Sequence, residues 1–444
     1  MNASLQCIWI KTYGCQMNQR DSDTLAAGLR AKGYTIVSNE NDADIALLNT
    51  CSVRALAESK AIGKAGRLLK KKKKNPNYRV GILGCMAARL GKQLLQTLPE
   101  LDWIAPPQAL AKIPDWIQET LQKPSCCGNV LSDAGNFDFR CYEQALLPSP
   151  VLSIPIQQGC SMKCSYCIVP KTRGPQQNRP FASIIQEIQQ AALQGTREVI
   201  LLGQIVNAYR DPEQGKSFVD LLTAIQNIEG IERIRFVSPH PAYFTDELLQ
   251  GLGRLPKICP ALHLPIQSGS NRMLQAMHRG YTREKILQLV RALRTLHPLI
   301  SLSTDIIVGY PGETEEDFEQ TYDLFQTVAF DMAYIFKYSP RPTTPSASLK
   351  DAVPTVDTRT QEARNQRLLS LLNETSTRYN QQFVHTKQTV LVEGSAHRGE
   401  QKWFGRNLYN KKVIFEGTPS LIGSFQTIRI TKATASALEG TRES

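Results

Sequence analysis

Three cysteines lie close together near the middle of the chain, at Cys160, Cys164 and Cys167. Cysteine thiolates are soft ligands that bind zinc or iron–sulfur clusters. A structural zinc site takes four protein ligands, and this stretch offers neither a fourth cysteine nor a histidine. A cubane cluster held by three cysteines keeps one iron free of protein ligands. Because such an iron can bind a substrate, the spacing indicates an open, catalytic cluster.

Three more cysteines follow strands that the sequence predicts in the first part of the chain. The strands, each with its cysteine, are 8–13 with Cys15, 44–50 with Cys51 and 78–84 with Cys85. Ligands of open parallel sheets bind beyond the carboxyl ends of the strands, so we expect these thiols to meet at one edge. Structural cysteines are the alternative, since free cysteines are often buried. A cysteine after each of the three strands favours a metal site.

The elements that position these thiols are readable from the apolar pattern. Short apolar runs alternate with helical patterns up to about residue 145, which predicts an α/β fold with a doubly wound parallel sheet. Six further strands alternate with helices and predict a central partial (β/α)6 barrel, with its chemistry at the carboxyl ends of the strands. These strands are expected at 153–159, 198–204, 233–238, 261–267, 301–310 and 333–339.

The patterns divide the chain into three domains and a linker. The N-terminal α/β domain covers 5–122, and the central barrel covers 146–377. Between them, 123–145 has little periodicity and several turn residues, so we interpret it as a linker. Short strands with glycine-containing turns over 378–440 predict a small antiparallel β-barrel.

Composition restricts the class of protein. The 444 residues are 41% hydrophobic and 21% charged, which is typical of globular proteins. The 11 cysteines, in a chain whose N-terminus shows no signal peptide, argue against a disulfide framework. No apolar run is long enough to span a membrane, so we expect a cytoplasmic protein. The net charge of +12 indicates an anionic partner such as nucleic acid.

The C-terminal β domain mixes aromatic and basic side chains. Trp403 lies among Arg406, Lys411 and Lys412, and this mixture suits single-stranded RNA, whose bases stack on rings while its phosphates pair with charge. We therefore predict that these four residues bind RNA. The alternative is that the aromatic residues form the core of the barrel, and for Phe415 this is our interpretation.

The stretch from Cys160 to Cys167 resembles the radical S-adenosylmethionine (SAM) signature, Cys-x3-Cys-aromatic-x-Cys, with Tyr166 as the aromatic residue. The resemblance extends over nearly the whole chain, to the MiaB-type tRNA methylthiotransferases, whose last domain is a TRAM domain. The segments that carry it include TYGCQMNQRDSD, NTCSVRALAESK, GILGCMA, TRG, HLPIQSGS, DIIVGYPGETEEDF and YSPRP.

The resemblance implies two 4Fe–4S clusters, and SAM as methyl donor and as radical source. SAM would bind the open iron of the cluster at Cys160, Cys164 and Cys167, and its reductive cleavage would give a 5′-deoxyadenosyl radical. A second cluster would be held by Cys15, Cys51 and Cys85. The reaction implied is methylthiolation at C2 of N6-isopentenyladenosine, next to the anticodon of tRNA. Related enzymes act on threonylcarbamoyl-adenosine in tRNA or on an aspartate of a ribosomal protein, and these substrates remain alternatives.

The same resemblance places Val308 and Tyr310 near the adenine of SAM. Gln204 and Gln267 end expected strands, and we predict that they contact SAM or the substrate. We expect the cofactors to carry the chemistry, without a catalytic side chain. The sequence departs from the usual GQNVN motif at Ile205, which concerns local substrate contacts and leaves the reaction class unchanged.

A protein of another class remains as an alternative, an RNA-binding protein whose cysteines hold structural zinc. For the enzyme we expect a flavodoxin- or ferredoxin-like electron donor, a tRNA partner, no membrane partner and a monomeric state.

Overall fold

The computed structural model describes residues 6–52, 55–122, 128–131, 135–143, 148–396 and 401–443. The chain forms two compact units. The first consists of 1–147, 155–162 and 167–179, and the second of 148–154, 163–166 and 180–444. Cys160 and Cys167 therefore belong to the first unit, whereas Cys164 belongs to the second. Within the described ranges, no helix is long and apolar enough to cross a membrane.

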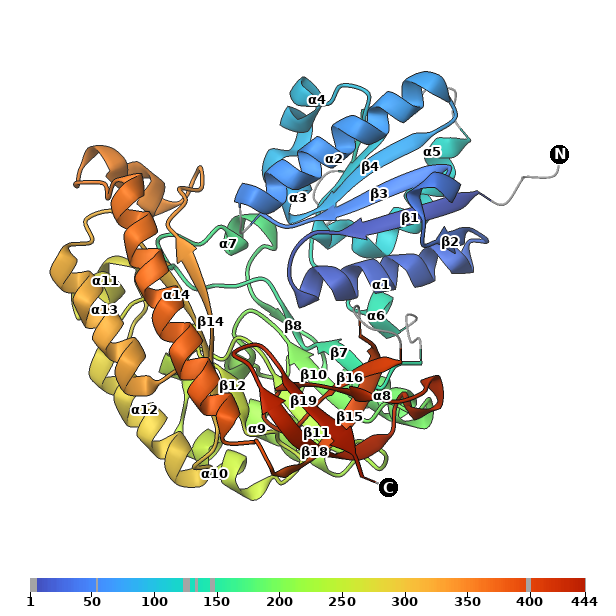
Figure 1. Cartoon of the computed structure of the whole chain (residues 1–444). Helices are drawn as coiled ribbons and strands as arrows, with labels where there is room; N and C mark the ends of the chain where they lie inside the picture. Colours follow the sequence, from blue (N-terminus) through green and yellow to red (C-terminus); the bar gives the residue numbers. More distant parts are fainter. Residues whose placement is uncertain are drawn as a thin grey trace. The chain divides into compact units, whose positions relative to one another are not determined.

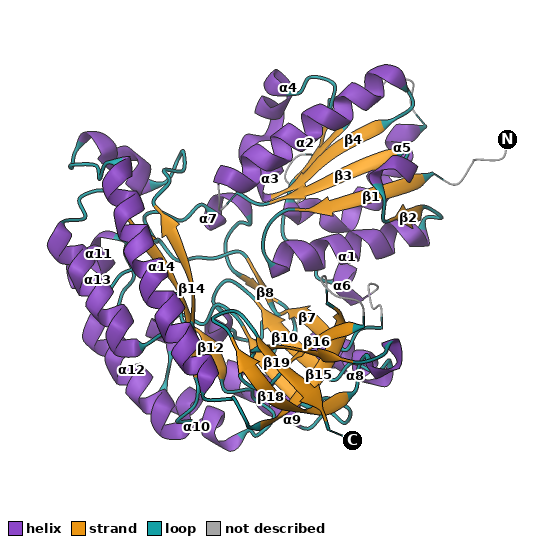
Figure 2. Cartoon of the chain, viewed as in Figure 1, coloured by secondary structure: helices purple, strands orange, loops and turns teal. Residues whose placement is uncertain are grey.

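The first unit contains a six-stranded parallel sheet of order β2-β1-β3-β4-β5-β6, with helices on both faces (Figures 1 and 2). This confirms the doubly wound sheet expected from the apolar pattern. Its strands are β1 (Cys7–Thr12), β2 (Thr35–Val37), β3 (Ile45–Thr50), β4 (Arg79–Gly84), β5 (Trp103–Ala105) and β6 (Asn129–Val130). Its helices are α1 (Gln16–Ala31), α2 (Ala55–Lys74), α3 (Cys85–Leu90), α4 (Leu94–Thr97), α5 (Ile113–Leu121) and α6 (Arg140–Glu143).

Two short edge strands of this sheet differ from the expectation. β2 was not anticipated, and β6 lies within the segment 123–145 that we interpreted as a linker. β6 has only two residues, Asn129 and Val130, and it pairs in parallel with β5. So short a strand has no apolar period to detect. The linker residues 123–127, 132–134 and 144–145 lie outside the described part of the chain.

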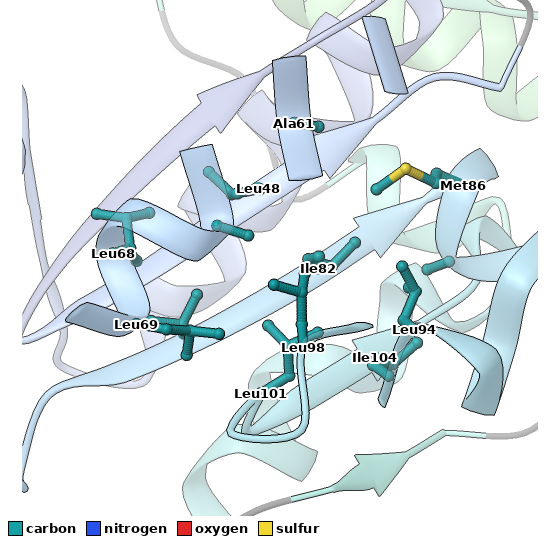
Figure 3. Packing of buried hydrophobic residues seen from close by; sticks show 14 of the residues in the cluster. Leu48, Ala61, Leu68, Leu69, Ile82, Met86, Leu94, Leu98, Leu101 and Ile104 are labelled. Atoms are coloured by element: carbon teal, nitrogen blue, oxygen red, sulfur yellow. The ribbon is translucent and has the colours of Figure 1, made fainter. Parts of the chain in front are cut away.

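The sheet is held between two hydrophobic cores because β3 alternates its side chains between the faces. Ala46 and Leu48 pack in the core beneath α2, whereas Ile45 and Leu47 pack in the core on the opposite face. Figure 3 shows the first core, where Leu48 and Ile82 of the sheet meet side chains of α2. Each fully buried aliphatic side chain contributes about 1.5–3 kcal/mol to folding. Two such layers fix the register of β1, β3 and β4, and hence the positions of their carboxyl ends.

The second unit contains the six strands expected for the partial barrel, in two three-stranded sheets of order β11-β10-β7 and β12-β13-β14. The pairs β10–β11, β12–β13 and β13–β14 are parallel. The strands are β7 (Val151–Pro155), β10 (Glu198–Leu202), β11 (Arg233–Phe236), β12 (Ala261–His263), β13 (Ser301–Val308) and β14 (Met332–Lys337). The helices are α8 (Phe181–Leu193), α9 (Phe218–Gln226), α10 (Asp246–Arg254), α11 (Asn271–Ala276), α12 (Arg283–Leu296), α13 (Glu315–Val328) and α14 (Thr358–Gln381).

β12 ends earlier than the apolar run 261–267 suggests. Pro265 has no amide hydrogen, so the run cannot continue as a regular ladder. The chain rejoins β13 at Gln267, whose backbone forms an isolated parallel bridge with Ile306. The segments around the cysteine loop add the antiparallel pair β8 (Gln157–Gln158) and β9 (Gln177–Asn178), and the short helix α7 (Val169–Thr172), to the first unit.

The C-terminal domain is a closed barrel of order β15-β16-β17-β19-β18 around a core that includes Phe415. Its strands are β15 (Lys387–Ser395), β16 (Lys402–Arg406), β17 (Lys412–Glu416), β18 (Phe425–Ala433) and β19 (Leu438–Arg442). Four neighbouring pairs are antiparallel, as expected of a small antiparallel barrel, and the pair β17–β19 is parallel. In a closed ring of five strands the directions cannot alternate all the way round, so at least one neighbouring pair must be parallel.

Candidate functional site

The cysteines that follow β1, β3 and β4 lie at the carboxyl edge of the first sheet. β3 is the neighbour of both β1 and β4. Thr50 and Gly84 are register partners at the ends of β3 and β4. Cys51 directly follows Thr50, and Cys85 directly follows Gly84. Cys15 is the residue directly before α1. Cys51 and Cys85 are buried, whereas Cys15 is exposed, which places one accessible thiol beside two enclosed ones.

Two glycines allow the backbone at this edge to pack closely. A Cβ at Gly14 would lie 2.7 Å from Cβ of Cys51, and one at Gly84 would lie 2.7 Å from the Thr50 carbonyl oxygen. Gly84 has φ 89° and ψ −157°, a conformation essentially restricted to glycine. The loops that carry the three thiols are therefore held together at distances that side chains would prevent.

Asparagine side chains join the loops at the same edge. The Cys15 thiol donates to Oδ1 of Asn18 at 3.1 Å, and Nδ2 of Asn18 donates to the Thr50 carbonyl at 3.2 Å. Nδ2 of Asn49 donates back to the Asn18 carbonyl at 2.8 Å. These bonds tie the start of α1 to the end of β3, and thus the loop of Cys15 to that of Cys51.

A buried polar network lies next to Cys85. Arg173, from the TRG motif, donates to Oδ2 of Asp21 and to Oε1 of Gln158, both at 2.7 Å. The Tyr142 hydroxyl donates to Oδ1 of Asp21 at 2.8 Å and accepts from Nε2 of Gln158 at 2.7 Å. Burial raises the pKa of the Cys85 thiol, and the guanidinium of Arg173 opposes that rise. A permanent cation therefore faces the thiol that a metal would need as thiolate.

The part of the central cysteine loop in the first unit is built on Gly159, whose φ is 72°. A Cβ there would lie 2.6 Å from the Gly174 carbonyl oxygen, which accepts the Cys160 amide at 3.1 Å. The Met162 amide donates to Sγ of Cys160 at 3.4 Å. Backbone amides aimed at cysteine sulfur suit a thiolate ligand, because they stabilise its negative charge.

Within the second unit, the cysteine loop rests on residues that follow β12 and β13. The Ser165 amide donates to the Met277 carbonyl at 3.2 Å, and the Ser165 hydroxyl bonds the Tyr310 hydroxyl at 2.8 Å. Tyr166 packs against the small core of Met273, Met277 and Tyr310. Nη1 of Arg279 donates to Sγ of Cys164 at 3.4 Å.

The candidate ligand groups of both cysteine sets are thiols. Among the described residues, no three His, Cys, Asp or Glu side chains converge closely enough to hold a single metal ion. In a cubane each cysteine binds a different iron, so the three sulfurs stand further apart than around one ion. The all-sulfur donor sets fit an iron–sulfur cluster better than a single hard cation.

Of the four residues expected to contact SAM, one has an unused polar side-chain atom, and the other three are held by the protein through their backbone or by burial. Oε1 of Gln204 is buried and has no hydrogen-bond partner among the described residues, as expected of a group that awaits a ligand. Gln267 has φ 73°, and its backbone makes two hydrogen bonds with β13: its amide donates to the Asp305 carbonyl, and its carbonyl accepts from the Ile307 amide. Val308 and Tyr310 are fully buried, and Tyr310 supports the cysteine loop. Their side chains face protein, so only their backbone is left to meet an adenine.

His240 is a second buried side chain with an unused polar atom. It follows β11 as Gln204 follows the neighbouring β10, and its Nε2 also has no partner among the described residues. Burial, helped by the charge of Arg279, lowers the pKa of His240 to about 3. The ring is therefore neutral at physiological pH. Together these atoms provide unused hydrogen-bonding capacity at the carboxyl ends of two adjacent strands.

A contact between a histidine and a carboxylate lies on two neighbouring strands of the second sheet of this unit. Nε2 of His263, on β12, lies 3.3 Å from Oδ2 of Asp305 on β13. Nδ1 of His263 lies 3.0 Å from the Ser303 hydroxyl. Asp305 thus has a partner on the neighbouring strand.

The C-terminal barrel separates the four residues predicted to bind RNA. Trp403 lies in the barrel core, so its ring cannot stack on a base; this corrects the sequence interpretation. Lys411 pairs with Asp331 and lies over the Tyr379 ring, so it too is committed within the protein. Lys412 remains, and Arg406, which lies opposite it across β16 and β17, pairs with Glu393 while staying partly exposed.

A second aromatic residue of β16, Phe404, accompanies these two cations. β16 alternates between buried and partly exposed side chains, so Phe404 lies on the same face as Arg406. Nζ of Lys412 lies 4.8 Å from the centre of the Phe404 ring. We call the surface formed by Phe404, Arg406 and Lys412 the outer β16–β17 face.

Family models match three segments of the chain. Residues 7–106 match the uncharacterized protein family UPF0004, 154–325 match the radical SAM superfamily, and 381–441 match the TRAM domain. The order of these matches agrees with the fold described above: the first sheet with its cysteine edge, the partial barrel and the closed five-stranded barrel.

Curated relatives match along nearly their full length. The tRNA-2-methylthio-N(6)-dimethylallyladenosine synthase of Opitutus terrae is 47% identical, over 98% of this chain and 96% of that protein. The proteins of the same name from Methylacidiphilum infernorum and Akkermansia muciniphila are 42% and 41% identical, each over 98% of this chain and over 94% and 98% of their own length.

Solved structures share the fold at low sequence identity. The radical SAM methyltransferase TsrM of Kitasatospora setae, solved with cobalamin and a 4Fe–4S cluster, has a TM-score of 0.55 at 15% identity, over 78% of this chain and 77% of that one. The cobalamin-dependent radical SAM enzyme OxsB has a TM-score of 0.52 at 13% identity, over 84% and 56%. With the identities of the curated relatives, these findings place the chain in the radical SAM methylthiotransferase family of the tRNA-2-methylthio-N(6)-dimethylallyladenosine synthases.

Proposed function

We propose that this enzyme replaces the C2 hydrogen of N6-isopentenyladenosine, next to the anticodon of tRNA, by a methylthio group. The observation that carries this proposal is the match to proteins named for the 2-methylthio-N(6)-dimethylallyladenosine product, along 98% of this chain at up to 47% identity. Dimethylallyl and isopentenyl name the same N6 substituent. The family uses SAM and 4Fe–4S clusters.

Each cysteine set would hold one cluster. Cys160, Cys164 and Cys167 would bind the cluster whose open iron takes SAM, and Cys15, Cys51 and Cys85 would bind the second. Supporting this assignment are the sulfur-only donors, the Met162 amide aimed at Cys160 and the guanidinium of Arg173 beside Cys85. When bound, the clusters and SAM supply the radical that removes the C2 hydrogen and the methyl group of the product.

The side chains of this chain would bind and orient rather than react. Oε1 of Gln204 and Nε2 of His240 are buried atoms without partners in the described structure, and they are suited to hydrogen-bond SAM or the substrate base. His240 remains neutral at physiological pH, so it offers a hydrogen bond without adding charge. The contact between Ser165 and Tyr310 would keep the cysteine loop in place during binding.

Mass spectrometry of tRNA nucleosides tests the substrate. Cells without the gene should accumulate N6-isopentenyladenosine and lack its 2-methylthio derivative. A plasmid-borne copy of the gene should restore the 2-methylthio derivative. If the threonylcarbamoyl nucleoside changes instead, the isopentenyl assignment is wrong. If neither changes and a ribosomal protein loses a methylthio group, the substrate is not tRNA.

A metal assay after anaerobic purification tests the cofactors. We expect about eight irons and a similar amount of sulfide per chain, as two cubane clusters require. Zinc without iron would instead identify a structural zinc protein that binds RNA without catalysis.

The two cysteine sets should fail differently when one ligand is removed. Cys15→Ala should still cleave SAM to 5′-deoxyadenosine but should lose methylthiolation, because the radical-forming cluster is untouched. Cys164→Ala should lose both activities. Chromatography of deoxyadenosine together with nucleoside mass spectrometry separates these outcomes, and methylthio product from Cys15→Ala would contradict the role of the second cluster.

The partners and the location follow from this chemistry. Reductive cleavage of SAM needs an electron donor, for which we expect a flavodoxin- or ferredoxin-like protein. We also expect the enzyme to act as a monomer in the cytoplasm, where its tRNA substrate is found.

A further inference from the structure

Arg279 is a buried guanidinium, and each of its three nitrogens donates a hydrogen bond to an acceptor around the central cysteine loop. Nη1 donates to Sγ of Cys164 at 3.4 Å, Nη2 to the Pro265 carbonyl at 2.7 Å and Nε to the Tyr281 hydroxyl at 2.9 Å. The residue is only 5% exposed. The hydrogen-bonding capacity of Arg279 is therefore well used, and its orientation is fixed by three separate segments.

The charge of Arg279, by contrast, is not matched by an acid. Among the described residues no carboxylate forms an ion pair with Arg279, whereas the buried Arg173 pairs with Asp21 and the buried Arg235 with Glu198. Its titratable neighbours are the phenols of Tyr166 and Tyr281, the thiol of Cys164 and the imidazole of His240. Burial raises the pKa of Tyr281 and lowers the pKa of His240 to about 3, so both side chains are neutral at physiological pH.

A lone buried cation is costly, and proteins rarely keep one without a partner. Of the neighbours just named, Cys164 is the one that becomes a permanent anion, as the thiolate ligand of a cluster. We propose that Arg279 is a positioning residue for the cluster at Cys160, Cys164 and Cys167, whose midpoint potential it raises by facing the Cys164 sulfur with a charge and a hydrogen bond. This inference rests on the proposed assignment of that cluster.

The direction of the effect follows from electrostatics. Reduction adds one negative charge to the cluster, and a nearby cation with an N–H bond to sulfur stabilises that charge. Losing the cation makes reduction harder, so the midpoint potential becomes more negative. A merely structural role of Arg279, through Pro265 and Tyr281, predicts no such shift in a folded variant.

The test is a potentiometric titration followed by electron paramagnetic resonance. The background is the holoenzyme carrying Cys15→Ala, Cys51→Ala and Cys85→Ala, which should hold one cluster and about four irons. In this background Arg279→Gln should shift the midpoint potential to a more negative value. Arg279→Lys, which keeps the charge, should shift it less.

Tyr281→Phe is the matched control. It removes the acceptor of the Arg279 Nε bond but keeps the charge and the contact with Cys164, so its midpoint potential should stay at the background value. An Arg279→Gln variant with full iron and an unshifted potential would overturn the inference. So would Tyr281→Phe with the same shift as Arg279→Gln.

If Arg279→Gln loses its iron, the iron content of Arg279→Lys tests whether the cluster needs a cation at this position. Iron retained by Arg279→Lys supports the need for a cation, and iron lost despite the charge contradicts it. If the background protein itself holds no cluster, the cysteine assignment of the proposed function fails. That failure is visible before any Arg279 variant is measured.

Discussion

Asp21 and Arg173 form an ion pair that is almost completely enclosed, with exposures of 4% for each side chain. Gln158 and Tyr142 complete the polar set around them. Buried ion pairs add little to stability against an apolar pair of equal size, but removing one partner leaves an uncompensated charge. We therefore interpret the main role of this ion pair as holding the guanidinium of Arg173 beside Cys85.

Asp21→Asn should lower the free energy of unfolding by about 3–5 kcal/mol, because the guanidinium of Arg173 would remain buried without its anion. Asp138→Asn is the control. Asp138 pairs with Arg140 at the surface, so its loss should cost about 0–1 kcal/mol. Urea unfolding of both variants measures the difference, and equal losses would show that burial of the Asp21 pair is not what matters.

His240 gives the protein a pH-dependent stability. Burial lowers its pKa to about 3 in the folded chain, against about 6.5 when unfolded. Below pH 6.5 the unfolded chain takes up a proton that the folded chain refuses, so stability falls as the pH falls, by at most about 1.4 kcal/mol per pH unit. The effect continues until the pH approaches the folded pKa.

His240→Asn should remove this slope between pH 6.5 and 5, because asparagine can still accept the Ala242 amide that His240 now accepts. His385→Asn is the control, since His385 is exposed and asparagine tolerates its φ of 67°. Urea midpoints of the metal-free protein across this range give the slopes. An unchanged slope in His240→Asn would assign the pH dependence to other groups.

At the residue scale the sequence predicts ligands better than their partners. The six cysteines are visible from spacing and from strand ends. Arg173 and Arg279 are not, because their partners Asp21 and Cys164 lie 152 and 115 residues away. Trp403 shows a second limit of prediction from sequence. Composition identifies an aromatic residue among cations, but only the register of β16 shows that its side chain faces the barrel core instead of the outer surface.

The ends of β3 and β4 are the elements on which the N-terminal cysteines depend. Gly84 closes β4 in a conformation that other residues rarely adopt, and its α-carbon faces the Thr50 carbonyl. A side chain at Gly84 must displace the end of β3, and the next residue along β3 is Cys51. The geometry of two cysteines therefore rests on one missing Cβ.

Gly84→Ala should reduce the iron content from about eight to about four per chain, because the N-terminal cluster loses its geometry while the other remains. Gly63→Ala is the control, since Gly63 lies within α2 and a Cβ added there would meet no atom within 4 Å, and alanine favours helix. Iron and sulfide assays give the readout. A Gly84→Ala protein with full iron would show that the strand ends adjust without loss.

The strands with long apolar runs were predictable, whereas the two short edge strands of the first sheet were not. β1, β3 and β4 were expected from runs of six or seven residues, whereas β2 and β6 have three and two residues. The parallel pair β17–β19 follows from closing a ring of five strands, because an odd number of strands cannot alternate in direction all the way round.

At the scale of the whole molecule, the net charge of +12 indicates attraction to RNA but not where RNA binds. Many of the cations already have partners, as Lys411 has Asp331 and Lys72 has Asp102. Charge therefore explains the association with tRNA in general, while a specific surface must combine cations with a ring. The outer β16–β17 face does so with Phe404, Arg406 and Lys412.

Lys412→Ala should weaken tRNA binding and lower the slope of log Kd against log salt by about 0.7–0.9, the value for one phosphate contact. Phe404→Ala should weaken binding by about 1–3 kcal/mol without changing that slope, because stacking releases no counterion. Lys432→Ala, an exposed cation elsewhere on the same barrel, is the control and should change neither. Fluorescence anisotropy with an anticodon stem-loop at several salt concentrations measures all three, while SAM cleavage without tRNA should stay at the wild-type rate. Equal effects of Lys412→Ala and Lys432→Ala would mean that the barrel contributes only its overall charge.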